Sequence, residues 1–231
     1  MTIDTRLLHK SAGQLNSFRI KNEILYVLDC ADELNWKPLG RKHLQKIIYL
    51  THALAPLREI VISFLKFYKY RYGPYTHEIQ NTLNNLIALG LVELISMEHY
   101  AGKNSTSSKH QITKEGKKVV KRLTLLEDNQ ERYDWIRTII RLIDVYGLEN
   151  LVDMVYQEPT FKSAEREGLG RSLDIDNLET NLSVKLIEFL KKHGHEKFNY
   201  ETTNLEIVLI SFFEYLYSVQ ITEKALEGGK K

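Results

Sequence analysis

The sequence predicts a mainly α fold of the α+β class, with a small antiparallel sheet in the first half and a helical bundle in the second. Three observations predict it. Apolar residues recur at helical spacing in both halves of the 231-residue chain. Stretches typical of strands, at 59–70 and 91–100, interrupt the helices of the first half. From about residue 128 onward the pattern is wholly helical.

The first two helices are expected at 22–34 and 41–54, where apolar residues repeat at helical spacing. Pro38 and Gly40 interrupt the chain between them, and Pro56 ends the second. The next segment is rich in β-branched and aromatic residues, so a strand is expected there. These elements begin a compact domain after a loose start.

A third helix is expected at 76–90, with Thr76 as its cap and Gly90 at its end. A strand at 91–100, a polar tip and a returning strand follow, and Thr113 introduces another helix. Helix, helix, strand, helix, strand, tip, strand is the order expected of a winged helix with one added strand.

In the second half, residues 162–176 are polar and are expected to form a loop. Asp176 and Glu179 have the spacing of a capping box for a helix that Gly194 closes. The last helix, at about 205–225, is apolar almost all round, so we expect it to be buried.

This pattern divides the chain into four regions. They are an N-terminal arm at 1–20 that is possibly loose, a winged-helix-like domain at 21–127, a helical bundle or interaction region at 128–226, and a disordered tail at 227–231. No apolar run approaches the length that spans a bilayer, and the N-terminus lacks an apolar signal core. With Cys30 as the single cysteine, disulfides and cysteine metal sites are excluded and a cytoplasmic protein is expected.

The net charge of +2 hides an asymmetry between the two halves. Residues 1–122 hold 19 Lys and Arg against 10 Asp and Glu, whereas residues 123–231 hold 13 against 20. A basic first half indicates contact with a polyanion, and uneven surface decoration is the alternative.

The stretch YKYRYGPYTHEI, at 68–79, contains four tyrosines around a Gly-Pro pair. Side chains alternate along a strand, so Tyr68, Tyr70 and Tyr72 are expected to share the face that packs on the helices. Base stacking or a protein contact by these rings stays open. Gly73, Pro74 and Tyr75 are expected to form the structural turn that leads into the third helix.

The motifs LGRKHLQKIIYL, KYRYGPYTHEI, ALGLVE and ITKEG resemble those of YwgA-like winged-helix proteins. They are more distantly similar to the Panacea-domain (SocA-like) antitoxins and to the C-terminal domain of DarG-type antitoxins. The resemblance covers about 40–125. It implies no enzymatic activity and a small module that acts through DNA or a partner protein, often in toxin–antitoxin or phage-defence operons.

Two surfaces are candidates for binding. On the third helix, His77, Asn81, Asn84 and Asn85 project opposite the apolar stripe, where they could contact bases or a partner protein. Basic residues, several of them on one face of 114–126, suit contacts with DNA phosphates. This phosphate-binding set consists of Lys42, Lys46, Lys66, Lys69, Lys103, Lys109, Lys114, Lys117, Lys118, Lys121 and Arg122.

No residues have an interpretable catalytic or metal-binding spacing, so we expect no enzyme activity, no metal and no cofactor. The expected function is DNA binding, as a regulator or as a subunit of a prokaryotic defence or toxin–antitoxin system. The alternative is a protein-binding, antitoxin-like or scaffold subunit that docks through its helical half. Expected partners are double-stranded DNA and either a protein from the same operon or a second copy of the chain, with no membrane involved.

Overall fold

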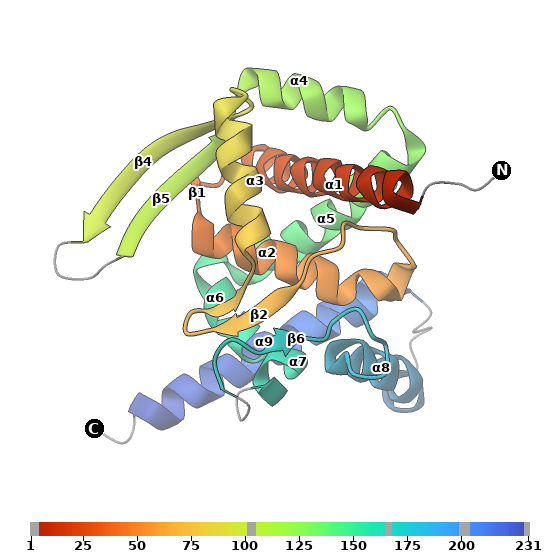
Figure 1. The fold of residues 1–231 in the computed structure, drawn as a ribbon. Helices are drawn as coiled ribbons and strands as arrows, with labels where there is room; N and C mark the ends of the chain where they lie inside the picture. Colours follow the sequence, from red (N-terminus) through yellow and green to blue (C-terminus); the bar gives the residue numbers. More distant parts are fainter. Residues whose placement is uncertain (1–4, 101–104, 165–167, 199–203, 229–231) are drawn as a thin grey trace. The chain divides into compact units, whose positions relative to one another are not determined.

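The computed structural model describes residues 5–100, 105–164, 168–198 and 204–228. These residues form nine α-helices and two three-stranded antiparallel sheets, which confirms the mainly helical α+β class (Figure 1). The chain divides into two compact units that alternate along the sequence, whereas a single boundary after residue 127 was expected. Unit 1 is Met1–Leu44, Ile60–Leu65 and Thr76–Arg137, and unit 2 is Gln45–Glu59, Lys66–Tyr75 and Thr138–Lys231.

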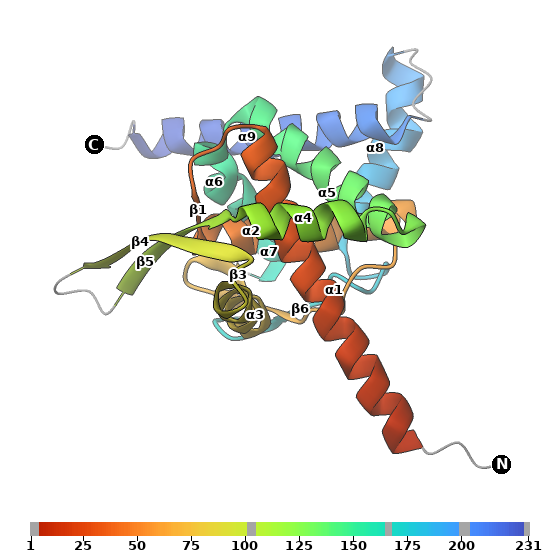
Figure 2. The same cartoon turned by 90° about the horizontal axis from the view of Figure 1, so that it is seen from above.

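Unit 1 is built around one long helix and a sheet. Its elements are α1 (Thr5–Glu33), β1 (Leu39–Gly40), the start of α2 (Arg41–Leu54), α3 (His77–Ala88), β4 (Val92–Tyr100), β5 (Ser105–Ile112), α4 (Lys114–Leu123) and the first part of α5 (Glu127–Tyr146). The strands lie in the order β1-β5-β4. Helices α3 and α4 and strand β5 all contact α1 (Figures 1 and 2).

The prediction of a loose N-terminal arm is wrong for its described part, because α1 begins at Thr5. Contacts with the segment 60–65 support this early part of the helix. Asn16 donates to the Phe64 carbonyl and accepts from the Phe64 N–H, at 2.9 and 2.6 Å. Farther along the helix, the buried Glu23 accepts from the backbone and hydroxyl of Ser63. Beyond it, every residue from Ile24 to Leu28 is buried.

The strand expected at 59–70 is reduced to β2 (Phe67–Tyr70). Residues 60–66 have no regular secondary structure, because side chains rather than a neighbouring strand satisfy part of their backbone. Besides Asn16 and Glu23, Arg132 donates to the Val61 carbonyl at 3.1 Å. The many β-branched and aromatic residues therefore indicate an extended segment here, but only the end of this segment pairs in a sheet.

The end of the β4–β5 hairpin is closely packed on α4. Thr113 caps α4 as predicted, accepting from the Gly116 N–H at 3.0 Å, and its backbone N–H bonds the Leu91 carbonyl. A Cβ added to Gly116 would lie 2.3 Å from the Leu91 carbonyl oxygen. Glycine is therefore needed at 116 for this approach of helix to strand.

Unit 2 contains the second sheet and most of the C-terminal helices. Its elements are the rest of α2, β2, β3 (Gly73–Tyr75), the rest of α5, α6 (Leu151–Tyr156), α7 (Pro159–Ser163), β6 (Ser172–Leu173), α8 (Leu182–Phe198) and α9 (Leu205–Gly228), with the 3-10 turns Ala55–Arg58 and Leu148–Asn150. The strands lie in the order β3-β2-β6. Strand β6 lies in the stretch that was expected to be a loop, and it pairs Leu173 with Phe67.

The predicted orientation of strand β2 is wrong. Phe67 and Lys69 face the interior, whereas Tyr70 and Tyr72 are exposed and Tyr68 is half-buried. Phe67 packs edge-on against Tyr49 of α2, with ring centroids 5.3 Å apart. Side chains alternate between the two faces of a strand, and this alternation does not show which face is buried. The buried Phe67 identifies the inner face of β2.

The turn predicted at Gly73, Pro74 and Tyr75 lies earlier, at residues 71 and 72. The three residues instead form β3, in which Tyr75 pairs with Tyr68 and Pro74 with Lys69. Gly73 has a φ of +92°, and a Cβ there would approach the Lys46 side chain to 2.7 Å. Glycine is thus required at 73 by the positive φ and by the nearby Lys46 side chain, and not by a turn that leads into α3.

A buried carboxylate connects three helices of unit 2. Glu158 is 0% exposed and accepts from the Tyr49 hydroxyl of α2 at 2.6 Å. It caps α7 by accepting from the N–H groups of Thr160 and Phe161. The Ser183 hydroxyl, in the first turn of α8, donates to its other oxygen. Four donors therefore satisfy one carboxylate.

The capping box predicted at Asp176 and Glu179 is wrong. Helix α8 begins at Leu182, and the Asn181 side chain caps it by accepting from the Val184 N–H at 3.1 Å. Asn181 also donates to the carbonyls of Ala53 and Ile175. The helix continues through Gly194 to Phe198, so the predicted end at that glycine is wrong too.

Helix α9 is buried on one face only, which corrects the expectation of full burial. Val208, Phe212 and Leu216 are buried, whereas Ile207 and Ile210 are exposed. Within the described residues, α9 is the one helix that is long and apolar enough to cross a membrane, which corrects the expectation that no apolar run approaches that length. Core helices of soluble proteins pass the same test, so length and composition do not assign it to a membrane.

Replacing Glu158 by alanine should lower the free energy of unfolding by about 3 kcal/mol. The change leaves the Tyr49 and Ser183 hydroxyls and two backbone N–H groups without their acceptor in a buried site. Glu179→Ala, at an exposed position, is the control and should change stability by less than about 0.5 kcal/mol. Urea unfolding measures both, and equal midpoints would contradict the prediction.

Gly116→Ala should destabilise the protein by about 1–3 kcal/mol, since α4 must move away from the fixed Leu91 carbonyl. Gly13→Ala in α1 is the matched control, because no atom lies within 4 Å of an added Cβ there. Alanine favours a helix by up to about 1 kcal/mol over glycine, so the control should be neutral or stabilising. Thermal unfolding of the two variants gives the comparison.

Candidate nucleic-acid interface

The polar face of α3 is exposed as predicted. Thr76 caps the helix by accepting from the Glu78 N–H. Ile79, Thr82, Leu83 and Leu86 form the buried stripe. The four residues expected to contact bases or a partner are exposed on the other side: His77, Asn81, Asn84 and Asn85.

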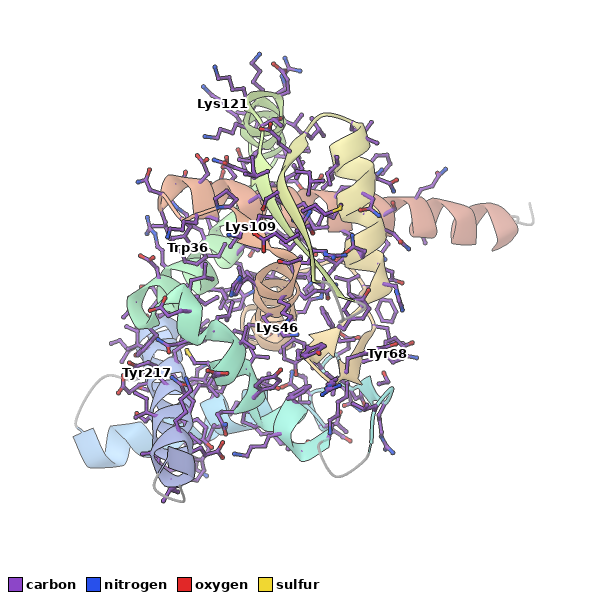
Figure 3. The ribbon with its side chains drawn as sticks, turned by 90° about the vertical axis from the view of Figure 1, so that its left-hand side faces the viewer. Trp36, Lys46, Tyr68, Lys109, Lys121 and Tyr217 are labelled. Atoms are coloured by element: carbon purple, nitrogen blue, oxygen red, sulfur yellow. The ribbon has the colours of Figure 1, made fainter. Side chains whose placement is uncertain are left out.

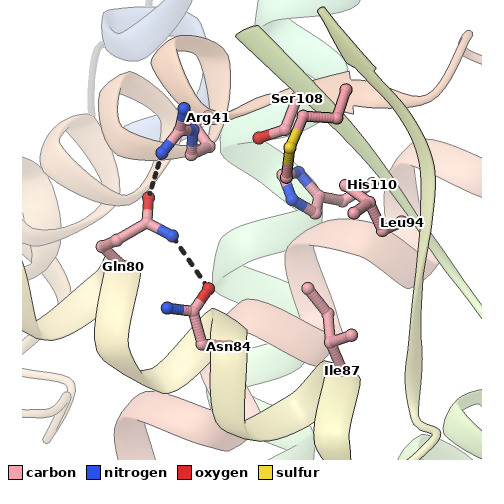
Figure 4. Close-up of a pocket in the computed structure, with 8 residues that line it drawn as sticks. Arg41, Gln80, Asn84, Ile87, Leu94, Ser108 and His110 are labelled. Carbon is pink, nitrogen blue, oxygen red and sulfur yellow. Dashed lines mark hydrogen bonds between the residues drawn. The ribbon is translucent and has the colours of Figure 1, made fainter. Parts of the chain in front are cut away.

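A groove of about 580 Å³ lies between α3 and the β4–β5 hairpin (Figure 4). All of its lining belongs to unit 1. It is formed by Arg41 at the start of α2, Gln80, Asn84 and Ile87 of α3, Leu94 and Met97 of β4, and Ser108 and His110 of β5. Clefts of about 300–1,000 Å³ are the usual size for small-molecule or base-sized ligands.

One wall of the groove is a chain of hydrogen bonds between polar side chains. The Arg41 guanidinium donates to Gln80 Oε1 at 3.2 Å, and Gln80 Nε2 donates to Asn84 Oδ1 at 3.0 Å (Figure 4). Gln80 and Asn84 are four residues apart, so they lie on adjacent turns of α3. We call these three residues the amide relay.

The lining also includes three apolar side chains. Ile87 follows Asn84 by one turn of α3, and Leu94 and Met97 face it from β4. The Met97 side chain is 65% exposed, which is a large apolar exposure for a strand residue. The register of β4 against β5 shifts between Leu94 and Ser96, so the hairpin is irregular beside the groove. The groove thus combines a network of polar side chains with apolar side chains from α3 and β4.

Ser108 and His110 alternate along β5 and both line the groove. His110 is 3% exposed, and its Nδ1 lies 3.4 Å from the Leu39 carbonyl oxygen. Burial, together with the nearby Arg41 charge, lowers the pKa of His110 below its usual range, although the Leu39 carbonyl opposes the shift. The imidazole is therefore neutral at pH 7.

The basic face predicted for 114–126 is exposed on α4, but part of its charge is paired. Lys117 forms an ion pair with Asp32, and this bond raises the pKa of Lys117 and lowers that of Asp32. Lys118 pairs with Glu115 at 2.7 Å. Lys114, Lys121 and Arg122 are exposed and form no ion pair with a described residue. These last three residues are called the α4 cations.

Two lysines of the predicted phosphate-binding set are buried and cannot meet a phosphate. Lys46 is 2% exposed and donates to the Pro74 carbonyl at 2.8 Å (Figure 3). Lys69 is 9% exposed and donates to the Ala164 carbonyl at 2.9 Å. Both side chains hold backbone segments of unit 2 in place.

The remaining lysines of the set are dispersed. Lys42 lies on α2, Lys66 precedes β2, and all three remaining described lysines are exposed, including Lys109 on β5 (Figure 3). Lys103 falls outside the described residues. The basic surface is therefore smaller than the sequence predicts, and the α4 cations form its main cluster.

The sequence pattern did not point to the four other polar residues of the groove: Arg41, Gln80, Ser108 and His110. Only Asn84 of the predicted face lines it. Gln80 could have been found, since it precedes Asn84 by four residues on a helix with a polar face. Arg41 could not, because its contact with Gln80 spans 39 residues of sequence.

Acidification should destabilise the protein through His110. Its folded-state pKa is lowered, so the unfolded chain binds the proton more readily, and stability falls as the pH drops through the unfolded value near 6.5. His110→Gln should therefore show a shallower loss of stability between about pH 7 and pH 5. Urea unfolding across this range tests it, with His77→Gln on the exposed face of α3 as the control.

No family model and no curated protein matches this sequence. The resemblance to YwgA-like winged-helix proteins therefore stays a hypothesis, and the residues of unit 1 provide the basis for a functional proposal.

Proposed function

We propose that unit 1 is a non-catalytic winged-helix module that binds double-stranded DNA through α3 and the β4–β5 hairpin. The observation that carries this proposal is the polar face that α3 exposes beside the hairpin. The face presents three asparagines and a histidine, and amide side chains are among the groups that contact base edges in the major groove. The major groove of DNA admits one α-helix.

The order of elements in unit 1 supports the same proposal. Helix α3 precedes a hairpin whose second strand pairs with both β4 and β1, giving the sheet order β1-β5-β4. A recognition helix followed by a β-hairpin is the arrangement of a winged helix. The added hairpin β2–β3 lies between α2 and α3 in the sequence.

The α4 cations are the best candidates for phosphate contacts. Unit 1 contains 16 Lys and Arg against 13 Asp and Glu, a net charge of only +3. Its affinity for DNA should thus depend on where the cations cluster rather than on overall charge. A cytoplasmic role as a regulator, or as the DNA-engaging subunit of a prokaryotic defence or toxin–antitoxin system, accords with such a module.

A protein partner is the second candidate, and exposed apolar side chains favour it. Leu89, Ile95 and Met97 are exposed at the end of α3 and on β4, and Ile207 and Ile210 are exposed on α9. Apolar exposure of this kind occurs at protein interfaces as well as at ligand grooves. A second copy of the chain or a protein from the same operon remains the expected partner in that case.

Duplex binding should weaken steeply with salt, and replacing all three α4 cations by alanine should flatten that dependence. Each phosphate contact contributes about −0.9 to the slope of log affinity against log salt, so the slope should become less negative by roughly 2–3. Fluorescence anisotropy with a labelled duplex measures it. The matched control removes Arg141, Lys185 and Lys192, which are exposed cations of unit 2.

The absence of any duplex binding at low salt would refute the DNA function and leave the protein-binding candidate. Equal slopes for the α4 variant and its control would instead show that α4 does not contact phosphates. Duplex binding that does not respond to salt would show that the protein makes no phosphate contacts, because counterion release accompanies every phosphate contact.

A further inference from the structure

Helix α9 of unit 2 has two opposite faces. Val208, Phe212 and Leu216 lie on the buried face, and helices α6 and α8 contact α9 while one side of it stays open along most of its length (Figure 2). With a turn of about 100° per residue, the side chains of the open side fall within an arc of about 120°. This surface, the α9 face, consists of Ile207, Ile210, Ser211, Glu214, Ser218, Ile221, Thr222 and Ala225, which are all exposed.

The α9 face lacks the charge that a solvated helix surface normally carries. Its three isoleucines are 40–49% exposed, and Glu214 is the single charged residue on it. A helix that presents isoleucines over several turns normally packs them against another element. The described part of the chain leaves them open to solvent, so the α9 face indicates a contact with another molecule.

The order of side chains along the α9 face suits a second copy of the same face. When two α9 helices pack antiparallel about a two-fold axis at the level of residue 216, positions equally far from 216 face each other. Each isoleucine then meets a smaller side chain of the other copy, which lets the two helices interdigitate closely. The opposed pairs are Ile207 with Ala225, Ile210 with Thr222, and Ile221 with Ser211.

Charged and hydrogen-bonding groups favour the same arrangement. Glu214 lies opposite Ser218 of the second copy, whose hydroxyl can donate to the carboxylate, whereas a parallel pair would place the two Glu214 carboxylates side by side. Glu206 and Lys224 lie on one flank of α9, five turns apart, so an antiparallel pair brings each Glu206 close to Lys224 of the other copy. Lys224 already pairs with Asp153 at 2.7 Å, and its ammonium has further N–H groups for a second carboxylate.

We infer that two copies of the chain dimerise through the α9 face, with their α9 helices antiparallel about a two-fold axis. This inference goes beyond the proposed DNA function and does not depend on it, because α9 belongs to unit 2. A two-fold pair also carries two copies of unit 1, which suits a DNA site made of two half-sites.

Light scattering and sedimentation of the full chain without DNA test the dimer. The wild type should have twice the 27.0 kDa mass of one chain. Ser218→Glu sets a carboxylate opposite Glu214 at two equivalent points, so it should weaken association by roughly a hundredfold. Ser218→Lys is the matched control, because its charge at the same exposed position attracts Glu214, and it should remain a dimer. Circular dichroism should show the same helix content for all three proteins.

Two variants with one added cysteine test the orientation. Positions 207 and 225 lie about 27 Å apart along one helix but face each other between antiparallel copies. A mixture of Ile207→Cys and Ala225→Cys chains should therefore form an intermolecular disulfide on mild oxidation, whereas neither variant alone should. The native Cys30 is buried and does not compete. A disulfide that forms within either variant alone would show a parallel pair and overturn the inference.

The remaining outcomes are also decisive. A wild-type mass of one chain at every concentration would overturn the inference, as would a Ser218→Glu protein that dimerises as tightly as Ser218→Lys. Monomers that float with vesicles of phosphatidylcholine and phosphatidylglycerol would overturn it too, and would assign the α9 face to a membrane. Anisotropy with a labelled duplex tests the DNA function separately, so a monomer that binds DNA refutes the dimer alone.

Discussion

Unit 2 depends on the burial of one carboxylate, Glu158. Removing a charge from water is costly unless hydrogen bonds replace its hydration, and no described Lys or Arg forms an ion pair with this group. Tyr49, Ser183 and the first N–H groups of α7 replace the water instead. Helix N-termini favour an anion, so the carboxylate also stabilises the starts of α7 and α8. Three helices distant in sequence are thereby fixed at one point.

The same reasoning explains the two buried lysines. Their ammonium groups donate to the carbonyls of Pro74 and Ala164, which lie on irregular or edge backbone of unit 2. Those carbonyls need donors, and a long side chain can bring one through an apolar interior while its stem packs among apolar neighbours. Lys46 and Lys69 are thus structural groups of the β2–β3 hairpin, although their charge alone makes them resemble DNA-binding residues.

In the groove of unit 1, by contrast, the three residues of the amide relay are not buried. The guanidinium at one end of the amide relay can only donate, so it determines which end of the Gln80 amide is the oxygen. The orientation of Gln80 in turn determines that of Asn84. Apolar groups from β4 lie across from it. Side-chain amides held in one orientation present their donors and acceptors in a fixed order, whereas amides that turn freely do not.

Local pattern was enough to predict much of this protein. The spacing of Ile79, Leu83 and Leu86 determined the inner face of α3, and Thr76 and Thr113 determined where two helices begin, since caps and helical periodicity act within a few residues. Tertiary structure alone decided which face of β2 is buried, that Lys46 and Lys69 lie inside, and that Arg41 meets Gln80. Alternation on a strand is symmetric between its two faces, and a side chain's partner depends on which distant segment lies opposite it.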